Sequence, residues 1–290
     1  MATACTQGIG TGFIDLGTAK VAVLGAIQGI TDVLPISSAA HMRIVPAVLG
    51  WADPGATFAA ALQLATAVAI VAHYRRDVWR IGAGAFEAGR SGDYRTFEFR
   101  TGVGILLASL PLIVGRIAFG RRVDLCATPT LELWVLGAAG VAVAATLAIA
   151  VLVRRHERGF EEIRLRDAVA LGLAQAFAVI PGVSRSGAAL TGALLMNLKP
   201  VEAVRYGLLA GLPATVFIGL EGSAGLRRAG LDAQAWGVLG IGFLAATLAA
   251  WLAIRLLIMV MERFSAWPFV AYRAVVGGFL LLVVWLDVLA

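Results

Sequence analysis

Two short stretches of the sequence place hydroxyl, imidazole, carboxylate and guanidinium groups inside otherwise apolar surroundings. One reads QGITDVLPISSAAH (residues 28–41) and the other reads PGVSRSGAAL (residues 181–190). A polar or charged side chain within an apolar region is costly, so it indicates function by default. Each stretch also holds a proline, which cannot continue a helix, followed by serines, which can begin a new one.

Arg185 is typical of an anion site. Its planar guanidinium suits two-point contact with a phosphate. Ser184 and Ser186 flank it, and the free backbone N–H groups at the start of a new helix are further anion donors. The alternative is a structural ion pair between Arg185 and an acid of another helix.

The first stretch supplies complementary chemistry. Gln28 and Asp32 are four residues apart, so they share a face if the segment is helical. Ser38 and His41 are three apart and can point into one cavity if a helix restarts after the proline. Asp32 is then a candidate base or divalent-cation ligand, Ser38 a candidate nucleophile and His41 a candidate proton carrier.

Plainer roles exist for the same residues. Ser37 and Ser38 could simply cap the restarted helix, and a lone histidine such as His41 is more often a packing residue. The cluster as a whole points to phosphate chemistry more strongly than any one of its members.

The composition predicts an integral membrane protein. Of 290 residues, 60% are hydrophobic and 14% charged, with a mean hydropathy of +0.86, whereas soluble domains are about 25% charged. The net charge of +6 comes from arginines between apolar stretches, so no nucleic-acid partner is expected. Cys5 and Cys126 lack metal-site spacing, and no secretory signal is expected because the first basic residue is Lys20.

Apolar stretches long enough to span a membrane alternate with polar, arginine-bearing loops. The two loops richest in arginine, Arg75–Arg100 with six and Arg154–Arg166 with five, should lie in the cytoplasm. Gly120–Thr130, between them, holds only two and should lie outside. The six predicted spans are Thr57–Tyr74, Thr101–Phe119, Leu131–Val153, Ala203–Leu220, Trp236–Met259 and Pro268–Val288.

Two further apolar regions, Lys20–Gly50 and Asp167–Leu198, are broken near their middles. Both contain Gly-x-x-Gln, an apolar run, a proline and serines, and their glutamines, Gln28 and Gln175, lie 147 residues apart. The predicted spans make the chain approach the first region from outside and the second from inside. Such opposed repeats place discontinuous helices at the midplane.

The predicted fold is therefore an all-α integral membrane protein. It is one membrane domain, residues 1–290, built as an inverted-repeat helical bundle with about six to eight spans and two re-entrant helical hairpins. The repeat halves are predicted at about residues 20–153 and 167–290.

Both stretches resemble the signatures of the undecaprenyl-diphosphate phosphatase family, which is also known for bacitracin resistance. QGITDVLPISSAAHM is similar to its first signature, which ends in Leu-Pro-x-Ser-Ser-x-x-His, and PGVSRSGA to its second, Pro-Gly-x-Ser-Arg-Ser. The pieces FAAALQLATAVAIV and LLAGLPA are also similar, so the resemblance covers most of the chain.

The resemblance implies an enzyme of the bacterial cytoplasmic (inner) membrane. It would remove the terminal phosphate of undecaprenyl diphosphate, giving the monophosphate carrier used in peptidoglycan synthesis, and would use a divalent cation, for which Mg²⁺ is expected. Carried over, the nucleophile is Ser38, the histidine is His41, and the paired acids are Gln28 and Asp32, with Asp32 as metal ligand. The phosphate-binding residues are Arg185, Ser184, Ser186 and Ser37.

The sequence departs from the family pattern at four positions. The usual glutamate is Asp32, one methylene shorter, and the usual threonine three residues after Ser186 is Ala189. Ala59 stands where an acid is usual, and Gly207 where a serine is usual.

A second hypothesis keeps the fold but not the reaction. The chain would then carry or flip polyprenyl phosphates with weak or no hydrolysis, because inverted repeats with midplane sites are common in secondary transporters. Ser38 and His41 favour the enzyme, since binding alone needs no nucleophile beside a proton carrier. A homodimer is left open by the sequence.

Overall fold

The chain is helical throughout a computed structural model that describes residues 10–123, 129–153 and 155–286; within these residues there is no β-strand. Cys5 and Cys126 lie outside the described residues. The α-helices are α1 (Phe13–Val33), α2 (Ser38–Val48), α3 (Ala56–His73), α4 (Arg75–Ser91), α5 (Phe97–Val123), α6 (Pro129–Val153), α7 (Leu165–Ala176), α8 (Arg185–Leu195), α9 (Pro200–Arg228), α10 (Ala233–Phe264) and α11 (Trp267–Trp285), with short 3-10 helices at Phe160–Glu162 and Phe177–Val179.

The six predicted spans are confirmed as α3, α5, α6, α9, α10 and α11, each long and apolar enough to cross a membrane. A seventh helix, α1, meets the same criterion. It begins at Phe13, before the predicted start of the broken region at Lys20, because the residues ahead of Lys20 continue the apolar pattern. The fold is therefore that of an all-α integral membrane protein.

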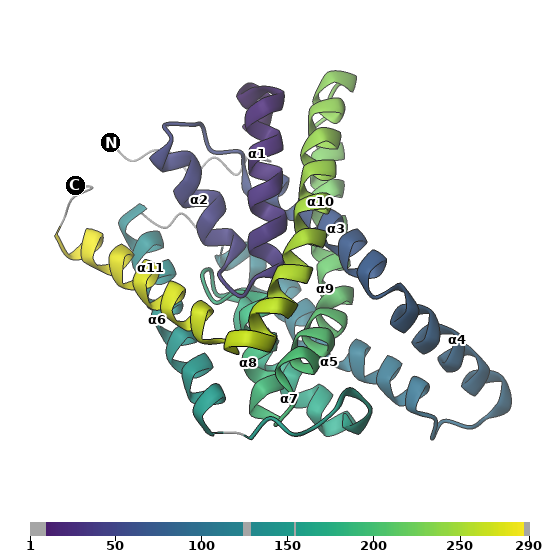
Figure 1. Cartoon of the computed structure of the whole chain (residues 1–290). Coiled ribbons are helices and arrows are strands. Elements are labelled where there is room, and N and C mark those ends of the chain that lie inside the picture. The colour runs from purple at the N-terminus through teal and green to yellow at the C-terminus, as the bar shows by residue number, and fades with distance from the viewer. Residues whose placement is uncertain (1–9, 124–128, 154, 287–290) are drawn as a thin grey trace.

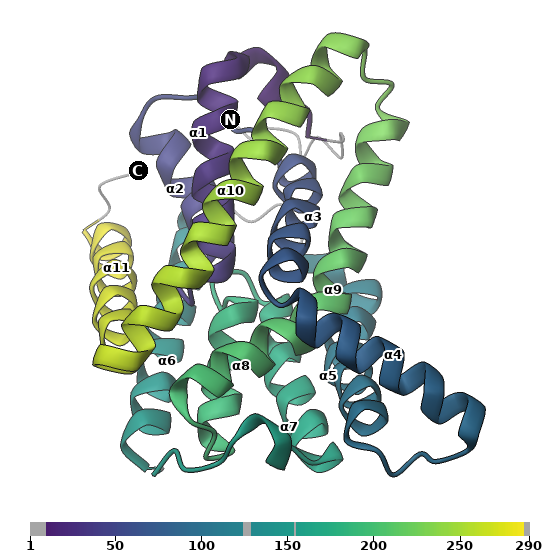
Figure 2. The ribbon, with the colours of Figure 1, turned by 45° about the vertical axis from the view of Figure 1, so that its right-hand side comes forward.

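The two broken regions form helical hairpins, α1–α2 and α7–α8, which enter the bundle from opposite ends (Figures 1 and 2). In the first, α1 ends at Val33, the extended residue Leu34 follows, and Pro35 prevents the helix from continuing. In the second, Gly182 has a φ of +93°, which permits the sharp turn before α8. The boundaries of the two repeat halves stay a prediction.

The predicted cytoplasmic loop Arg75–Arg100 is mostly helical, which corrects its description as a loop. It contains α4 and the start of α5, which lie side by side and away from the main bundle (Figure 2). Ile81 and Ala88 of α4 are buried, and Ile81 faces Gly102 of α5. The many arginines lower the mean hydropathy of the segment, so hydropathy alone does not show that one side of the helix is apolar.

Small residues set the closest helix contacts. Gly25 and Gly29 of α1 face the backbone of Gly242 and Ala246 of α10, where an added Cβ at either glycine would overlap a carbonyl oxygen. Such close approach is the usual way that helices pack in lipid, where burial of apolar surface gives little driving force. It fixes α1, and with it the first hairpin, against α10.

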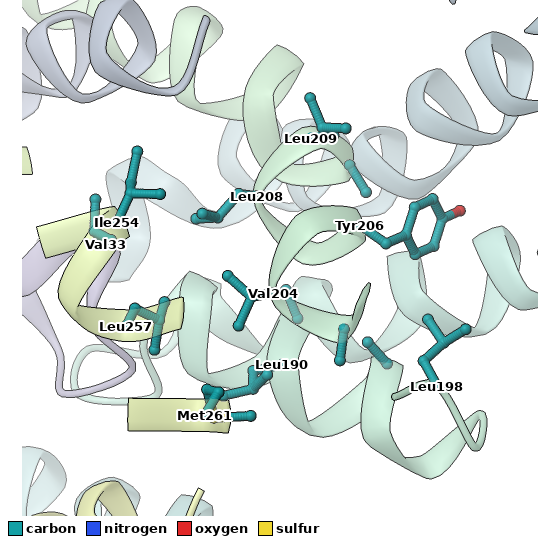
Figure 3. Packing of buried hydrophobic residues seen from close by; sticks show 14 of the residues in the cluster. Val33, Leu190, Leu198, Val204, Tyr206, Leu208, Leu209, Ile254, Leu257 and Met261 are labelled. Atoms are coloured by element: carbon teal, nitrogen blue, oxygen red, sulfur yellow. The ribbon is translucent and has the colours of Figure 1, made fainter. Parts of the chain in front are cut away.

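The largest buried cluster surrounds α9 (Figure 3). Val204, Leu208 and Leu209 of α9 pack there with Ile254 and Leu257 of α10. Because Val33, the last residue of α1, and Leu190 of α8 belong to the same cluster, the core holds both hairpins in place.

Candidate functional site

The turns of the two hairpins meet inside the bundle. The Ser186 hydroxyl, at the start of α8, donates a hydrogen bond of 3.0 Å to the carbonyl oxygen of Leu34, in the turn after α1. This contact joins residues 152 positions apart in the chain. The two sequence stretches are therefore brought together at their turns.

Both hairpins turn with the same local geometry. Ser37 caps α2 and Ser184 caps α8, and their φ angles are 75° and 68°. The Ser37 hydroxyl accepts from the N–H of Ala40 at 3.4 Å, and that of Ser184 from the N–H of Gly187 at 3.2 Å. The capping role that the sequence left open is thus present, with Ser38 and Arg185 as the first residues of the two helices.

Arg185 links the two hairpins electrostatically. Its guanidinium lies 3.3 Å from the Asp32 carboxylate, and both side chains are at most 8% exposed. It also donates to the carbonyl oxygen of Gly211, at 3.0 Å, and to the hydroxyl of Thr215 on α9. The ion pair considered in the sequence analysis therefore exists, and it holds a guanidinium at the meeting point of the two turns.

Each of the two hairpins also holds a buried glutamine whose amide oxygen has no partner among the described residues. Gln28 is 1% exposed, and within the described residues its Oε1 has no hydrogen-bond partner. Gln175 donates through Nε2 to the carbonyl oxygen of Ala108, at 3.1 Å, but its Oε1 is likewise unpaired there. A Cβ at Gly211 would lie 2.8 Å from Nη1 of Arg185 and 3.1 Å from this Oε1. Glycine at that position therefore lets the two side chains approach α9.

The hydrogen bonds of His41 define its tautomer. Its Nδ1 lies 2.8 Å from the carbonyl oxygen of Ser37, which can only accept, so Nδ1 carries the proton. Its Nε2 lies 2.6 Å from the Tyr272 hydroxyl of α11 and accepts from it when the ring is neutral. The Ser38 hydroxyl is half-buried and has no hydrogen-bond partner among the described residues. His41 is thus bonded through both ring nitrogens, and no hydrogen bond joins it to Ser38.

Arg273 of α11 is a buried residue of the site that the sequence analysis missed. It is 2% exposed and donates to the carbonyl oxygen of Pro35 at 3.1 Å and to those of Gly182 and Val183 at 2.8 and 3.2 Å. It therefore binds both turns at once. An arginine within a predicted apolar span was the signal that could have identified it.

Two of the four departures from the family pattern touch each other. A Cβ at Gly207 would lie 3.4 Å from the Cβ of Ala189. A small crevice between Ser186, Pro35 and Gly207 lies directly beside this contact. The hydroxyls that the family usually has at positions 189 and 207 would therefore lie next to each other. Ala59 is elsewhere, on α3 beside a separate apolar cluster.

The donor set suits a hard cation held partly by its substrate. No cluster of three or more His, Cys, Asp or Glu side chains occurs among the described residues. Asp32 and the unpaired Oε1 of Gln28 are oxygen donors from one helix face. Mg²⁺ is commonly bound by one or two carboxylates together with waters and substrate phosphates, so these residues fit it.

Comparisons with known proteins agree along most of the chain. Residues 21–279 match the profile of the family described as "Bacitracin resistance protein BacA". The chain is 45% identical over 256 residues to "Undecaprenyl-diphosphatase 2" of Mesorhizobium japonicum, covering 88% of this chain and 97% of that protein. It is 39% identical over 260 residues to "Undecaprenyl-diphosphatase" of Synechococcus elongatus, covering 89% and 90%.

Proposed function

The chain belongs to the BacA family of bacitracin resistance proteins, and on that premise we propose that it hydrolyses undecaprenyl diphosphate to undecaprenyl phosphate and inorganic phosphate. The reaction recycles the lipid carrier of cell-wall synthesis. The observation that supports the proposal is the meeting of the two turns, through the hydrogen bond from Ser186 to Leu34 and the ion pair of Arg185 with Asp32.

The diphosphate would bind between the two helix starts. Arg185 offers its guanidinium, Ser184 and Ser186 their hydroxyls, and the first turns of α2 and α8 their backbone N–H groups. Ser37 caps α2 and so keeps the neighbouring Ser38 at the end of its helix. Arg273 fixes the distance between the turns by binding carbonyl oxygens of both.

Ser38 acts as the nucleophile in this proposal. Its oxygen attacks the terminal phosphorus while Nε2 of His41 takes the hydroxyl proton, which requires Nε2 to exchange the Tyr272 hydroxyl for that of Ser38. The bond from phosphorus to the bridging oxygen breaks, and the lipid phosphate leaves with the electron pair. His41 then releases its proton to solvent, and in the second half it takes a proton from water. That water attacks the phosphoserine, and His41 returns the proton to the Ser38 oxygen.

We also propose a divalent cation, with Mg²⁺ as the expected ion, held by Asp32 and Gln28. When bound, it would neutralise diphosphate charge and stabilise the leaving phosphate. Asp32 would then have two positive partners, the cation and Arg185, which suits a carboxylate buried to this degree.

The proposed location is the bacterial cytoplasmic membrane, because the chain is a multi-pass membrane protein and its substrate is a lipid. The carrier hypothesis gives no role to a serine at the start of α2 and a histidine one turn later on the same helix. A homodimer stays an alternative, which the oligomeric state of the purified protein in detergent would test.

Phosphate release from undecaprenyl diphosphate by the purified protein, with Mg²⁺ and with chelator, tests the proposal. We expect Ser38→Ala and His41→Ala each to reduce release by about 10²–10⁴-fold. The double variant should be little worse than either single variant, because linked catalytic groups are not additive. Arg185→Lys should lose at least about tenfold, since an ammonium cannot reproduce the two-point contact.

Ser223→Ala is the matched control, because that hydroxyl bonds only to its own helix, at the carbonyl oxygen of Gly219. It should release phosphate like the parent. A folded parent that releases no phosphate with Mg²⁺ would end the phosphatase proposal. Full activity in Ser38→Ala would instead assign the attack to water.

A further inference from the structure

Helix α4 carries an exposed aromatic stripe. Trp79 is 77% exposed and Phe86 69% exposed, and their spacing of seven residues puts them on one side of the helix. The other side, with Ile81 and Ala88, is buried toward α5. The aromatic side chains thus point away from the rest of the molecule.

The place of α4 in the chain brings this stripe close to the membrane. The span α3 ends at His73, two residues before α4 begins, and the next span begins at Phe97. Both ends of α4 are therefore tied to the same face of the bilayer. In Figures 1 and 2 it diverges from the bundle beside α5.

Five acids at this end of the molecule, Asp77, Glu98, Glu161, Asp167 and Glu202, have arginine partners. Arg80 binds Glu98 and Glu161, while Asp77 is paired with Arg205. Arg158 forms an ion pair with Asp167, and the hydrogen bond to this carboxylate raises the pKa of Arg158 above its usual value. Glu87, Asp93 and Glu157 form no ion pair with any described residue.

Three arginines on the exposed side of α4 lack such a partner. Arg75, Arg76 and Arg90 form no ion pair with any described residue. Arg75 and Arg90 lie near the two ends of the line through Trp79 and Phe86. A helix with aromatic residues flanked by unpaired arginines has charge complementarity to an anionic lipid surface.

We propose that this α4 stripe (Arg75, Arg76, Trp79, Phe86 and Arg90) lies in the headgroup layer of the arginine-rich face and binds anionic phospholipid. Trp79 and Phe86 sit at the boundary between headgroups and acyl chains, the depth that aromatic residues favour. The arginines reach up to lipid phosphates along their flexible stems. The surface is separate from the hydrolytic site and does not depend on the proposed function.

The test is the immersion of single nitroxide labels in the full-length protein. A label at position 86, in a protein with Cys5→Ser and Cys126→Ser, is compared with one at position 87, about 100° around the helix. The protein is placed in vesicles of phosphatidylcholine with phosphatidylglycerol. The spin relaxation of the label at 86 should be enhanced more by oxygen, which enters the bilayer, than by a water-soluble nickel chelate. The label at 87 should show the reverse.

The anionic part of the proposal is tested with two matched arginine pairs. Arg75→Gln/Arg76→Gln changes adjacent arginines of α4, and Arg227→Gln/Arg228→Gln makes the same change at the far end of α9. For the α4 pair, half-maximal immersion of position 86 should need at least about fivefold more phosphatidylglycerol, which corresponds to about 1 kcal/mol for one arginine at an anionic surface. For the α9 pair the midpoint should stay unchanged.

Three results would overturn the proposal. The label at 86 could be as accessible to the nickel chelate as the label at 87. Dipolar broadening between labels at 86 could show a second copy seated on the stripe. Immersion could also be independent of the phosphatidylglycerol fraction, which would leave a hydrophobic contact with no preference for anionic lipid.

Discussion

Tyr272 holds the ring of His41 in one orientation through a hydrogen bond of 2.6 Å to Nε2, the nitrogen that would take the proton from Ser38. We expect Tyr272→Phe to lower kcat about tenfold with little change in KM, since one hydrogen bond of about 1.5 kcal/mol is lost. Added to His41→Ala, the same change should cause no further loss. Steady-state phosphate release gives both values.

Tyr206→Phe is the control for this prediction. The Tyr206 hydroxyl is buried but has no hydrogen-bond partner among the described residues, so its removal should leave kcat unchanged. If the losses of kcat caused by Tyr272→Phe and His41→Ala were instead multiplicative in the double variant, Tyr272 would support the fold near the site and would not position the histidine.

The sequence was informative about single residues where a motif is local. Arg185 and the serines stand out because glycine, proline and polar groups interrupt an apolar run. Tyr272 and Arg273 could not be placed in the same way, because their partners lie between 90 and 238 residues away in the chain. The sequence around these two residues does not predict which distant residues their side chains bind.

At the scale of elements, the contact of α1 with α10 depends on glycine. A side chain at Gly29 would overlap the carbonyl oxygen of Ala246, so we expect Gly29→Val to lower the free energy of unfolding by about 1–3 kcal/mol or more. Thermal unfolding in detergent measures the change. Activity should fall with it, because α1 carries Gln28 and Asp32.

Gly240→Val, on α10 itself, is the matched change, since nothing lies within 4 Å of a Cβ at that position. It should unfold close to the parent temperature. Equal destabilisation by the two substitutions would mean that helix propensity, and not the close contact, decides their effect.

Helix boundaries were predictable where hydropathy alone decides them. The six spans stood out because each is a long run that only a bilayer accommodates. The helix α4 did not, because its buried residues are only Ile81 and Ala88 and arginines surround them in the sequence. Its helical state depends on packing against α5, which the segment's own composition does not reveal.

For the whole molecule, the two hairpins entering from opposite ends imply one orientation in the membrane. We expect single cysteines at Glu87 and Glu161, in protein lacking Cys5 and Cys126, to react with an impermeant maleimide only from the cytoplasmic side. A cysteine at Gly230, at the other end of α9, should react only from outside. Labelling of position 87 in intact cells would reverse the assigned orientation and with it the sides from which the hairpins enter.

The repeated Gly-x-x-Gln and proline-serine pattern indicated that two similar hairpins exist, but not how they meet. Their relative placement results from the cluster around α9 and from Arg273, which draw on helices far apart in the sequence. Only the assembled bundle determines that the Ser186 hydroxyl reaches the Leu34 carbonyl oxygen.

Ser37 and Ser184 both have positive φ angles, which lower the stability of the fold, although both serines belong to the proposed phosphate site. Glycine adopts this conformation without penalty, whereas a non-glycine residue there costs about 1–3 kcal/mol, more than the few tenths lost when glycine replaces a capping serine. Ser37→Gly and Ser184→Gly should therefore raise the melting temperature while slowing phosphate release. Directed evolution that selects for heat resistance alone would therefore enrich these two substitutions early. Only a parallel screen for phosphate release would show that they reduce activity.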